Sequence, residues 1–159
     1  MDRRRGFLGS NPKLPLTVED KGKLRKAKVK LGDIHTLSTN QIAEILEMSL
    51  DEAKKIKALA EFQRVPSIGY ELAEKLVNHL HIFSLQELQE KDGATLFNEL
   101  EKKMGVWTDS CVEDQIRCVI HFANNPKSNK QWFEFTQERK KYREVYGYPD
   151  DRPETAWYE

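Results

Sequence analysis

The stretch Arg64-Val65-Pro66-Ser67-Ile68-Gly69-Tyr70-Glu71-Leu72-Ala73-Glu74-Lys75-Leu76 decides the fold of this chain. Pro66 disfavours helical geometry at Val65, so a helix that precedes it should stop there. Gly69 can take a positive φ at little steric cost, which permits a tight turn. A second helix follows, because apolar residues then recur at helical spacing. They are Leu72, Ala73, Leu76, Val77 and Leu80.

The start of this second helix is a candidate site for an anion. Its first backbone N–H groups have no partner within the helix, and they point outward from a glycine turn. We expect the amides around Ile68, Gly69 and Tyr70 to hold a nucleic-acid phosphate, with Ser67 in the turn and Lys75 as the first base after it. The alternative is a hairpin that serves only to pack two helices together.

Length and composition indicate a soluble globular protein. The chain has 159 residues, of which 33% are charged and 38% hydrophobic, a composition on the polar side of the ordinary range. No apolar run approaches the length of a membrane span, and the basic N-terminus lacks the apolar core of a signal peptide. We therefore expect a cytoplasmic protein that does not enter a membrane.

Charge is unevenly spread along the chain, although the formal net charge is +0. Residues 1–30 hold ten bases and three acids, which is a net charge of +7. A basic arm of this kind is a candidate nucleic-acid footprint, and the alternative is a solvated tail without a ligand. Residues 1–16 contain Gly and Pro and show no apolar period. We expect that segment to be flexible and to make few contacts.

Capping signals predict helices along the rest of the chain. A Ser followed three residues later by Glu or Gln is a capping box that starts a helix, and Asp is a favoured cap as well. The predicted starts lie at Thr17, Ser38, Ser49, Ser84, Asp92 and Ser110. No segment alternates in a strand period over more than a few residues. The predicted fold class is therefore all-α, with six or more helices and short links.

Two helical pairs appear in succession. The first turns at Gly69 and the second at Gly105, with a connector over 84–90 between them. Each pair resembles the helix-hairpin-helix motif of DNA-repair and recombination proteins, and two such pairs resemble its double form. In the second hairpin, the residues expected to contact a phosphate are Gly105, Val106, Trp107 and Thr108.

The first hairpin departs from that motif at two places. The usual turn reads hydrophobic-Gly-hydrophobic-Gly, whereas Ser67 here replaces the first glycine. Many members carry Lys or Arg after the second glycine, whereas this chain has Tyr70 and Glu71. Both departures bear on phosphate binding and not on the fold.

A closer resemblance covers about residues 38–145. The small bacterial helix-hairpin-helix family named for a pathogenicity locus or for mitomycin resistance has a similar combination of elements. These elements are Val65–Gly69, Gly105–Asp114, Ile120–Ala123 and Gln131–Arg139. The resemblance implies a helix-hairpin-helix fold and an association with DNA, and it carries over no catalytic residue.

The predicted organisation has three parts. A basic flexible arm with a short helix over about 18–30 covers 1–37, and a tandem helix-hairpin-helix domain, opened by an N-terminal helical hairpin, covers 38–130. A C-terminal aromatic helix and tail covers 131–159. We expect Trp157 and Tyr158 in this tail to dock on the domain, and the rival is a peptide that binds a partner.

The sequence contains no catalytic motif that would indicate an enzyme. Walker, G-x-S-x-G and H-E-x-x-H patterns are absent from the sequence. Cys111 and Cys118 are separated by about two helical turns, roughly 10 Å, which is too far for a disulfide. Together with Asp114 and His121 they fall near one helix face, but one straight helix cannot surround an ion tetrahedrally. We expect no metal, no cofactor and no catalytic residue, and two reduced, partly or fully buried thiols.

The favoured function is weak, sequence-independent DNA binding through the amides of both hairpins, accessory to repair or recombination. The alternatives are a protein–protein adaptor that binds no nucleic acid and an uncharacterised enzyme. The sign of the charge around the hairpins discriminates between them. Bases that favour DNA are Arg64, Lys75, Lys102, Lys103 and Arg117, and acids that oppose it are Glu71, Glu74, Glu99 and Glu101.

Overall fold

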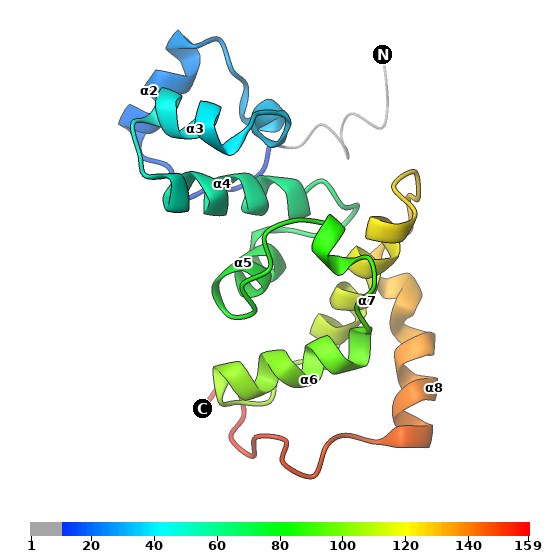
Figure 1. Cartoon of the computed structure of the whole chain (residues 1–159). Helices are drawn as coiled ribbons and strands as arrows, with labels where there is room; N and C mark the ends of the chain where they lie inside the picture. Colours follow the sequence, from blue (N-terminus) through cyan, green and yellow to red (C-terminus); the bar gives the residue numbers. More distant parts are fainter. Residues whose placement is uncertain (1–10) are drawn as a thin grey trace.

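The computed structural model describes residues 11–159, and every regular element within them is a helix (Figure 1). The predicted all-α fold is confirmed. The α-helices are α2 (Val18–Lys26), α3 (Thr39–Leu46), α4 (Leu50–Phe62), α5 (Tyr70–Asn78), α6 (Gly93–Met104), α7 (Ser110–Asn124) and α8 (Thr136–Tyr146). Short 3-10 helices are η1 (Leu31–Thr36), η2 (Gln86–Leu88) and η3 (Trp132–Phe135). Within 11–159, no helix has both the length and the apolar character to cross a bilayer.

Helix α4 joins two apolar cores. Its residues Ala53, Ile56 and Ala60 are buried against α2, η1 and α3, whereas Leu59 and Phe62 are buried in the larger core of α5, α6 and α7. Figure 1 shows α4 between these two groups of helices. Because both cores contain residues of α4, this continuous helix connects the N-terminal helices to the second group.

Local capping explains most helix starts. The capping boxes at Thr17, Ser38 and Ser49 are present, each with the reciprocal pair of hydrogen bonds. The Asp92 side chain accepts from the amide of Thr95 at 2.9 Å and caps α6. These predictions are confirmed. The sequence could predict these caps because the donor and acceptor in each case lie only three residues apart.

The capping box predicted at Ser110 is wrong. The N-cap of α7 is Asp109, whose side chain accepts from the amide of Cys111 at 3.0 Å. Glu113, the expected partner of Ser110, is fully buried and hydrogen-bonds to Arg117 and Arg143 instead. The ion pairs in the core therefore displace the local cap.

Two helix boundaries also differ from the prediction. The first helix, expected over 18–30, ends at Lys26, and Lys28 then takes a positive φ of 61°. The helix before the first hairpin ends at Phe62 rather than at Val65. At Ser84 the box is only partly formed, because Glu87 accepts from the amide of Phe83.

Residues 11–16 pack on the helical body. The amide of Lys13 donates to the Gln63 side chain at 2.9 Å, and the Gln63 amide group donates back to the Lys13 carbonyl at 2.8 Å. Leu14 packs against both cores. The expectation of few contacts is therefore wrong for 11–16, and the rest of the expected flexible stretch, residues 1–10, lies outside the described residues.

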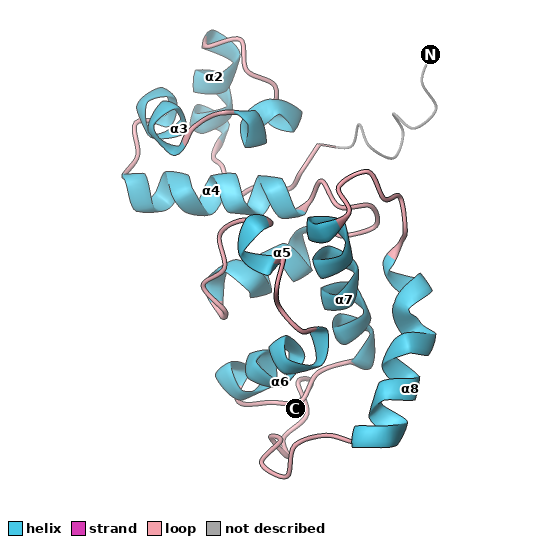
Figure 2. Cartoon of the chain, turned by 45° about the vertical axis from the view of Figure 1, so that its right-hand side comes forward, coloured by secondary structure: helices cyan, strands magenta, loops and turns pink. Residues whose placement is uncertain are grey.

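The C-terminal segment wraps the second helical pair. Helix α8 runs beside α7, and residues 147–159 then return along α6 (Figure 2). The tail docks through its backbone, because the amide of Trp157 donates to the Trp107 carbonyl at 2.9 Å and Ala156 is fully buried. The Tyr158 ring packs edge-on against Trp107, and the Trp157 and Tyr158 side chains stay 53% and 67% exposed.

Three buried carboxylates hold this segment in place. Glu101, Glu113 and Asp114 are at most 1% exposed, and each pairs with an arginine from residues 136–159. The Arg–carboxylate distances are 2.7 Å for Arg152–Glu101, 3.0 Å for Arg143–Glu113 and 2.8 Å for Arg139–Asp114. A buried charge is tolerated only when it is paired and hydrogen-bonded, so α6 and α7 depend on the C-terminal segment.

Candidate functional site

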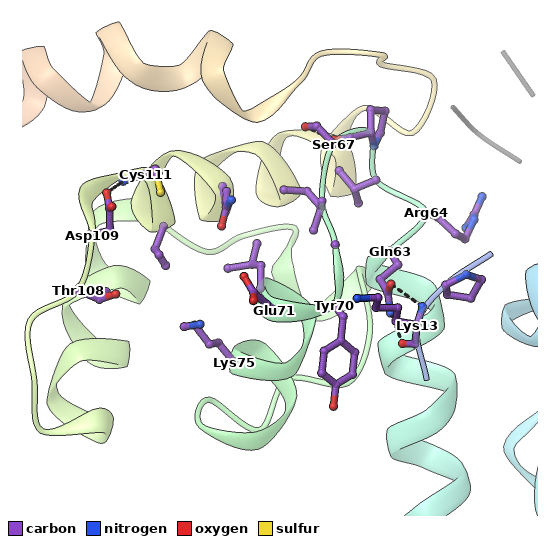
Figure 3. Close-up of a pocket in the computed structure, with 18 of the residues that line it drawn as sticks. Lys13, Gln63, Arg64, Ser67, Tyr70, Glu71, Lys75, Thr108, Asp109 and Cys111 are labelled. Carbon is purple, nitrogen blue, oxygen red and sulfur yellow. Dashed lines mark hydrogen bonds between the residues drawn. The ribbon is translucent and has the colours of Figure 1, made fainter. Parts of the chain in front are cut away.

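A groove of about 920 Å³ lies between the two helical pairs (Figure 3). Its first wall is formed by residues 63–72 and Lys75, and its second by Met104, Val106 and residues around the start of α7. Residues 11–13 and Trp157 complete the lining. The fold therefore brings together the two hairpins that the sequence singled out.

Most of the predicted site residues line this groove. Seven of them do so, namely Ser67, Ile68, Gly69, Tyr70, Lys75, Val106 and Thr108. Gly105 and Trp107 do not, and Trp107 instead lines an adjoining hollow with Trp157 and Tyr158. Lys13 and Trp157 were missed by sequence reasoning. Trp157 was expected only to dock with the tail, and Lys13 was counted only as one of the ten bases of residues 1–30.

The N-terminus of α5 opens into the groove without a cap. Gly69 is the N-cap residue, and no side chain of residues 11–159 accepts a hydrogen bond from the first turn. Within the described residues the amides of Gly69, Tyr70 and Glu71 have no acceptor. The amide of Ile68 donates to the Val65 carbonyl at 3.1 Å. It is therefore not available for a ligand, although the sequence analysis expected it to be. The available donors begin at Gly69.

The strained residue of the turn is Ser67 and not Gly69. Gly69 has φ −108° and ψ −167°, a conformation open to any residue, whereas Ser67 has φ 67°. The serine hydroxyl accepts from the amide of Trp132 at 2.9 Å and so fastens the turn to η3. The positive φ that the sequence permits at Gly69 is therefore found at Ser67 instead.

The second hairpin is already satisfied by the protein itself. Gly105, with φ 73°, ends α6 and donates to the Glu101 carbonyl. The amide of Trp107 donates to Thr155 at 2.9 Å, and the amide of Thr108 donates to the buried Glu101 carboxylate at 2.7 Å. Of the four residues predicted there, Val106 alone has an amide without an acceptor in 11–159. A phosphate would have to displace hydrogen bonds within the chain.

The groove carries three bases and two acids. Figure 3 shows Lys75 on the side that faces Asp109, whereas Lys13 and Arg64 lie at the opposite end. Glu71 lies at the start of α5, and the Asp109 carboxylate is engaged in capping α7. With three bases against two acids, the formal charge of the groove lining is +1.

Of the nine residues in the sequence-based charge comparison, Arg64, Lys75 and Glu71 line the groove and the other six do not. Arg117 is paired with Glu113 and with Glu138, so it is not an open cation. Glu101 is buried against Arg152, so it presents no repulsive charge at the surface. Lys102 forms an exposed pair with Asp151 at 2.9 Å. Sequence proximity to a hairpin did not predict which charges face the groove.

The two thiols are poor nucleophiles in this environment. Burial, with smaller contributions from Asp109, raises the pKa of Cys111 to about 11. Burial raises the pKa of Cys118 to about 12. Both are free cysteines, and only the thiolate form reacts. In the part of the chain that the structure describes, no three His, Cys, Asp or Glu side chains gather as a metal site.

Comparison with known families matches residues 55–141 to the family model Cdd1, described as "Pathogenicity locus". The matched segment runs from within α4 into α8 and includes both hairpins of the groove. Residues 142–159, which supply Arg143, Arg152 and Trp157, lie beyond it. No curated protein and no solved structure matches the chain.

Proposed function

The chain belongs to the pathogenicity-locus family Cdd1, and we propose that it binds DNA weakly and without sequence specificity through the N-terminus of α5. In this proposal α4–α5 and α6–α7 form a tandem helix-hairpin-helix unit that is accessory to DNA repair or recombination and performs no catalysis. One observation carries it: the uncapped first turn of α5 opens into a groove that also holds Lys13, Arg64 and Lys75.

The physical basis is the positive end of a helix. The amides of Gly69, Tyr70 and Glu71 lack acceptors within the described residues, and the helix dipole adds a partial positive charge of roughly +0.5 at this end. A phosphate oxygen satisfies such donors well. Because the donors are main-chain groups, the contact carries no base information.

The affinity expected from such a site is low. Non-specific DNA binding at physiological salt has dissociation constants of roughly 10⁻⁴ to 10⁻⁶ M. Backbone amides release few counterions, so the salt dependence should come from Lys13, Arg64 and Lys75. The proposal relies on the first hairpin alone, because three of the four amides expected in the second are bonded within the chain.

The test replaces Gly69 by aspartate. An ideal Cβ at Gly69 meets no atom within 4 Å, and aspartate is a favoured N-cap residue, so Gly69→Asp should fold. Its carboxylate would occupy the free amides and repel phosphate. We expect DNA affinity, measured by fluorescence anisotropy at two salt concentrations, to fall below detection. Gly69→Ala, which adds a Cβ without charge, is the matched control and should retain binding.

Two results would contradict the proposal. If Gly69→Asp is folded by circular dichroism and binds DNA as the parent does, the start of α5 is not the phosphate site. If the parent itself shows no affinity for DNA at low salt, the protein–protein adaptor replaces this function. The adaptor is favoured by exposed apolar side chains on η3 and α8, where Phe133, Val145 and Tyr146 are 54%, 72% and 70% exposed.

A further inference from the structure

We propose, resting on the function above, that the preferred ligand is single-stranded DNA whose bases stack on aromatic side chains at the two ends of the groove. The inference comes from two hollows that adjoin the groove and from the residues that they share with it. Neither the phosphate contact at α5 nor the family match distinguishes a single strand from a duplex.

The three hollows adjoin one another through shared lining residues, and we refer to them together as the track. A hollow of about 570 Å³ on the side of α2 shares Lys13 and Tyr70 with the groove and adds Lys21. A hollow of about 530 Å³ on the opposite side shares Trp157 with the groove and adds Tyr158. The track therefore runs from α2, past the start of α5, to the C-terminal tail.

Aromatic side chains stand at both ends of this track. Trp157 is 53% exposed and Tyr158 is 67% exposed. The Tyr158 ring lies edge-on to Trp107 and to Trp157, at interplanar angles of 89° and 87°, so these contacts are not face-to-face stacks. At the other end, Tyr70 is half-buried near Lys13 (Figure 3). Such rings offer stacking surfaces for bases.

Three bases, together with the acids Glu71 and Asp109, occupy the stretch between the aromatic ends. Lys13 and Arg64 lie at one end of the groove, and Lys75 lies on the side that faces Asp109. A strand in the track would thus place phosphates at its centre and bases at its ends. Arg152, in the last hollow, is engaged by Glu101 and by the Tyr148 ring, so it contributes structure rather than a free cation.

This arrangement favours a single strand over a duplex. Bases inside a duplex are stacked on one another, so a side chain reaches their faces only at the cost of unstacking base pairs or extruding a base. Bases in a single strand have accessible faces, and stacking on aromatic rings tolerates any sequence. The track therefore combines sequence-independent phosphate contacts with sequence-independent stacking.

The experiment compares a single strand and a duplex of equal length. A labelled thymidine oligonucleotide of about 16 nucleotides, the upper range for one stacking site, is titrated by anisotropy alongside its duplex. We expect the parent to bind the single strand more tightly. Trp157→Ala should weaken single-strand binding at least about five-fold, the lower limit for loss of one stacked base, without changing duplex affinity. Trp157→Phe should restore most of it.

Phe133→Ala is the matched control. Phe133 is exposed to the same degree as Trp157, at 54% against 53%, but does not line the track. This variant should bind both ligands as the parent does. Tryptophan fluorescence gives a second readout, because the thymidine strand should quench it in the parent and an abasic strand with the same phosphates should not. Trp157→Phe should lose that quenching.

The failures of the two proposals are distinguishable. If Gly69→Asp abolishes binding but Trp157→Ala binds the single strand as the parent does, the stacking inference is overturned and the phosphate site stands. A parent that prefers the duplex overturns the inference too, as does equal loss of both ligands in Trp157→Ala. If Gly69→Asp binds both ligands normally, the phosphate site and the inference fail together.

Discussion

Arg152 holds the buried carboxylate of Glu101 with two hydrogen bonds, from Nε at 2.7 Å and from a terminal nitrogen at 2.9 Å. The same carboxylate accepts from the amide of Thr108. One acid on α6 therefore joins the end of the chain to the link between α6 and α7. The tail residue Ala156 and the Trp107 backbone pair alongside this contact.

Arg152→Ala should destabilise the protein strongly, because it leaves the Glu101 carboxylate buried and without its charge partner. Removing one partner of a buried pair costs about 3–5 kcal/mol, and we expect about 3 kcal/mol here because Arg152 is partly exposed. That corresponds to a melting temperature roughly 6–12 °C lower, measured by circular dichroism. Lys102→Ala, which removes an exposed pair with Asp151, is the control and should leave the melting temperature unchanged.

Positions 67 and 69 should respond oppositely to glycine. Ser67 has a positive φ, so Ser67→Gly should be more stable than Ser67→Ala by about 1 kcal/mol, since only the alanine keeps a strained Cβ. Both variants lose the hydrogen bond from Trp132, which makes their difference informative. At position 69, Gly69→Ser should raise stability by about 0.5–1 kcal/mol through capping and a less flexible unfolded chain. Chemical denaturation measures both, and a preference for glycine at position 69 would contradict the observed turn.

Stability should fall below neutral pH in part through His35. Burial and the nearby Arg64 guanidinium lower the pKa of this imidazole from 6.5. The unfolded state therefore binds the proton more readily, so the contribution is complete above pH 6.5 and is lost as the pH falls toward the lower folded pKa. His35→Gln should show a smaller drop in melting temperature than the parent across that window. An identical drop would mean that His35 does not titrate differently on folding.

Cys111 should react slowly with iodoacetamide even though it lines the groove. With a pKa raised to about 11 by burial, its thiolate is roughly a hundredfold scarcer at neutral pH than that of an ordinary cysteine. Mass spectrometry should find slow alkylation of Cys111, slower alkylation of Cys118, and equal rates in denaturant. Fast labelling of Cys111 in the folded protein would contradict the buried environment.

The helices and their starts could be predicted because their causes are local. Thr17, Ser38 and Ser49 each cap a helix through a residue three positions away. The failure at Ser110 has the opposite cause, since its expected partner Glu113 is bound by Arg143 from 30 residues further along. Nothing near Glu113 in the sequence marks that competition.

The candidate site could likewise be predicted where its causes are local and not where they are long-range. The sequence identified the hairpin at Gly69 from proline, glycine and the helical period that follows. It could not show that Ser67 takes the positive φ, because the hydroxyl of this residue is engaged by Trp132, 65 residues away. Nor could it show that the second hairpin is satisfied by Glu101 and the tail.

By itself, the sequence determined the all-α class, the helix starts with local caps and the two turns that line the groove. Each depends on the period of apolar residues or on hydrogen bonds across three positions. Only the tertiary structure decided which hairpin amides lack an acceptor within residues 11–159, which charges line the groove and that Trp157 lines it too. These properties depend on which distant segments the packing brings within hydrogen-bonding distance. The ion pair between Arg152 and Glu101 is the contact that holds the tail against α6.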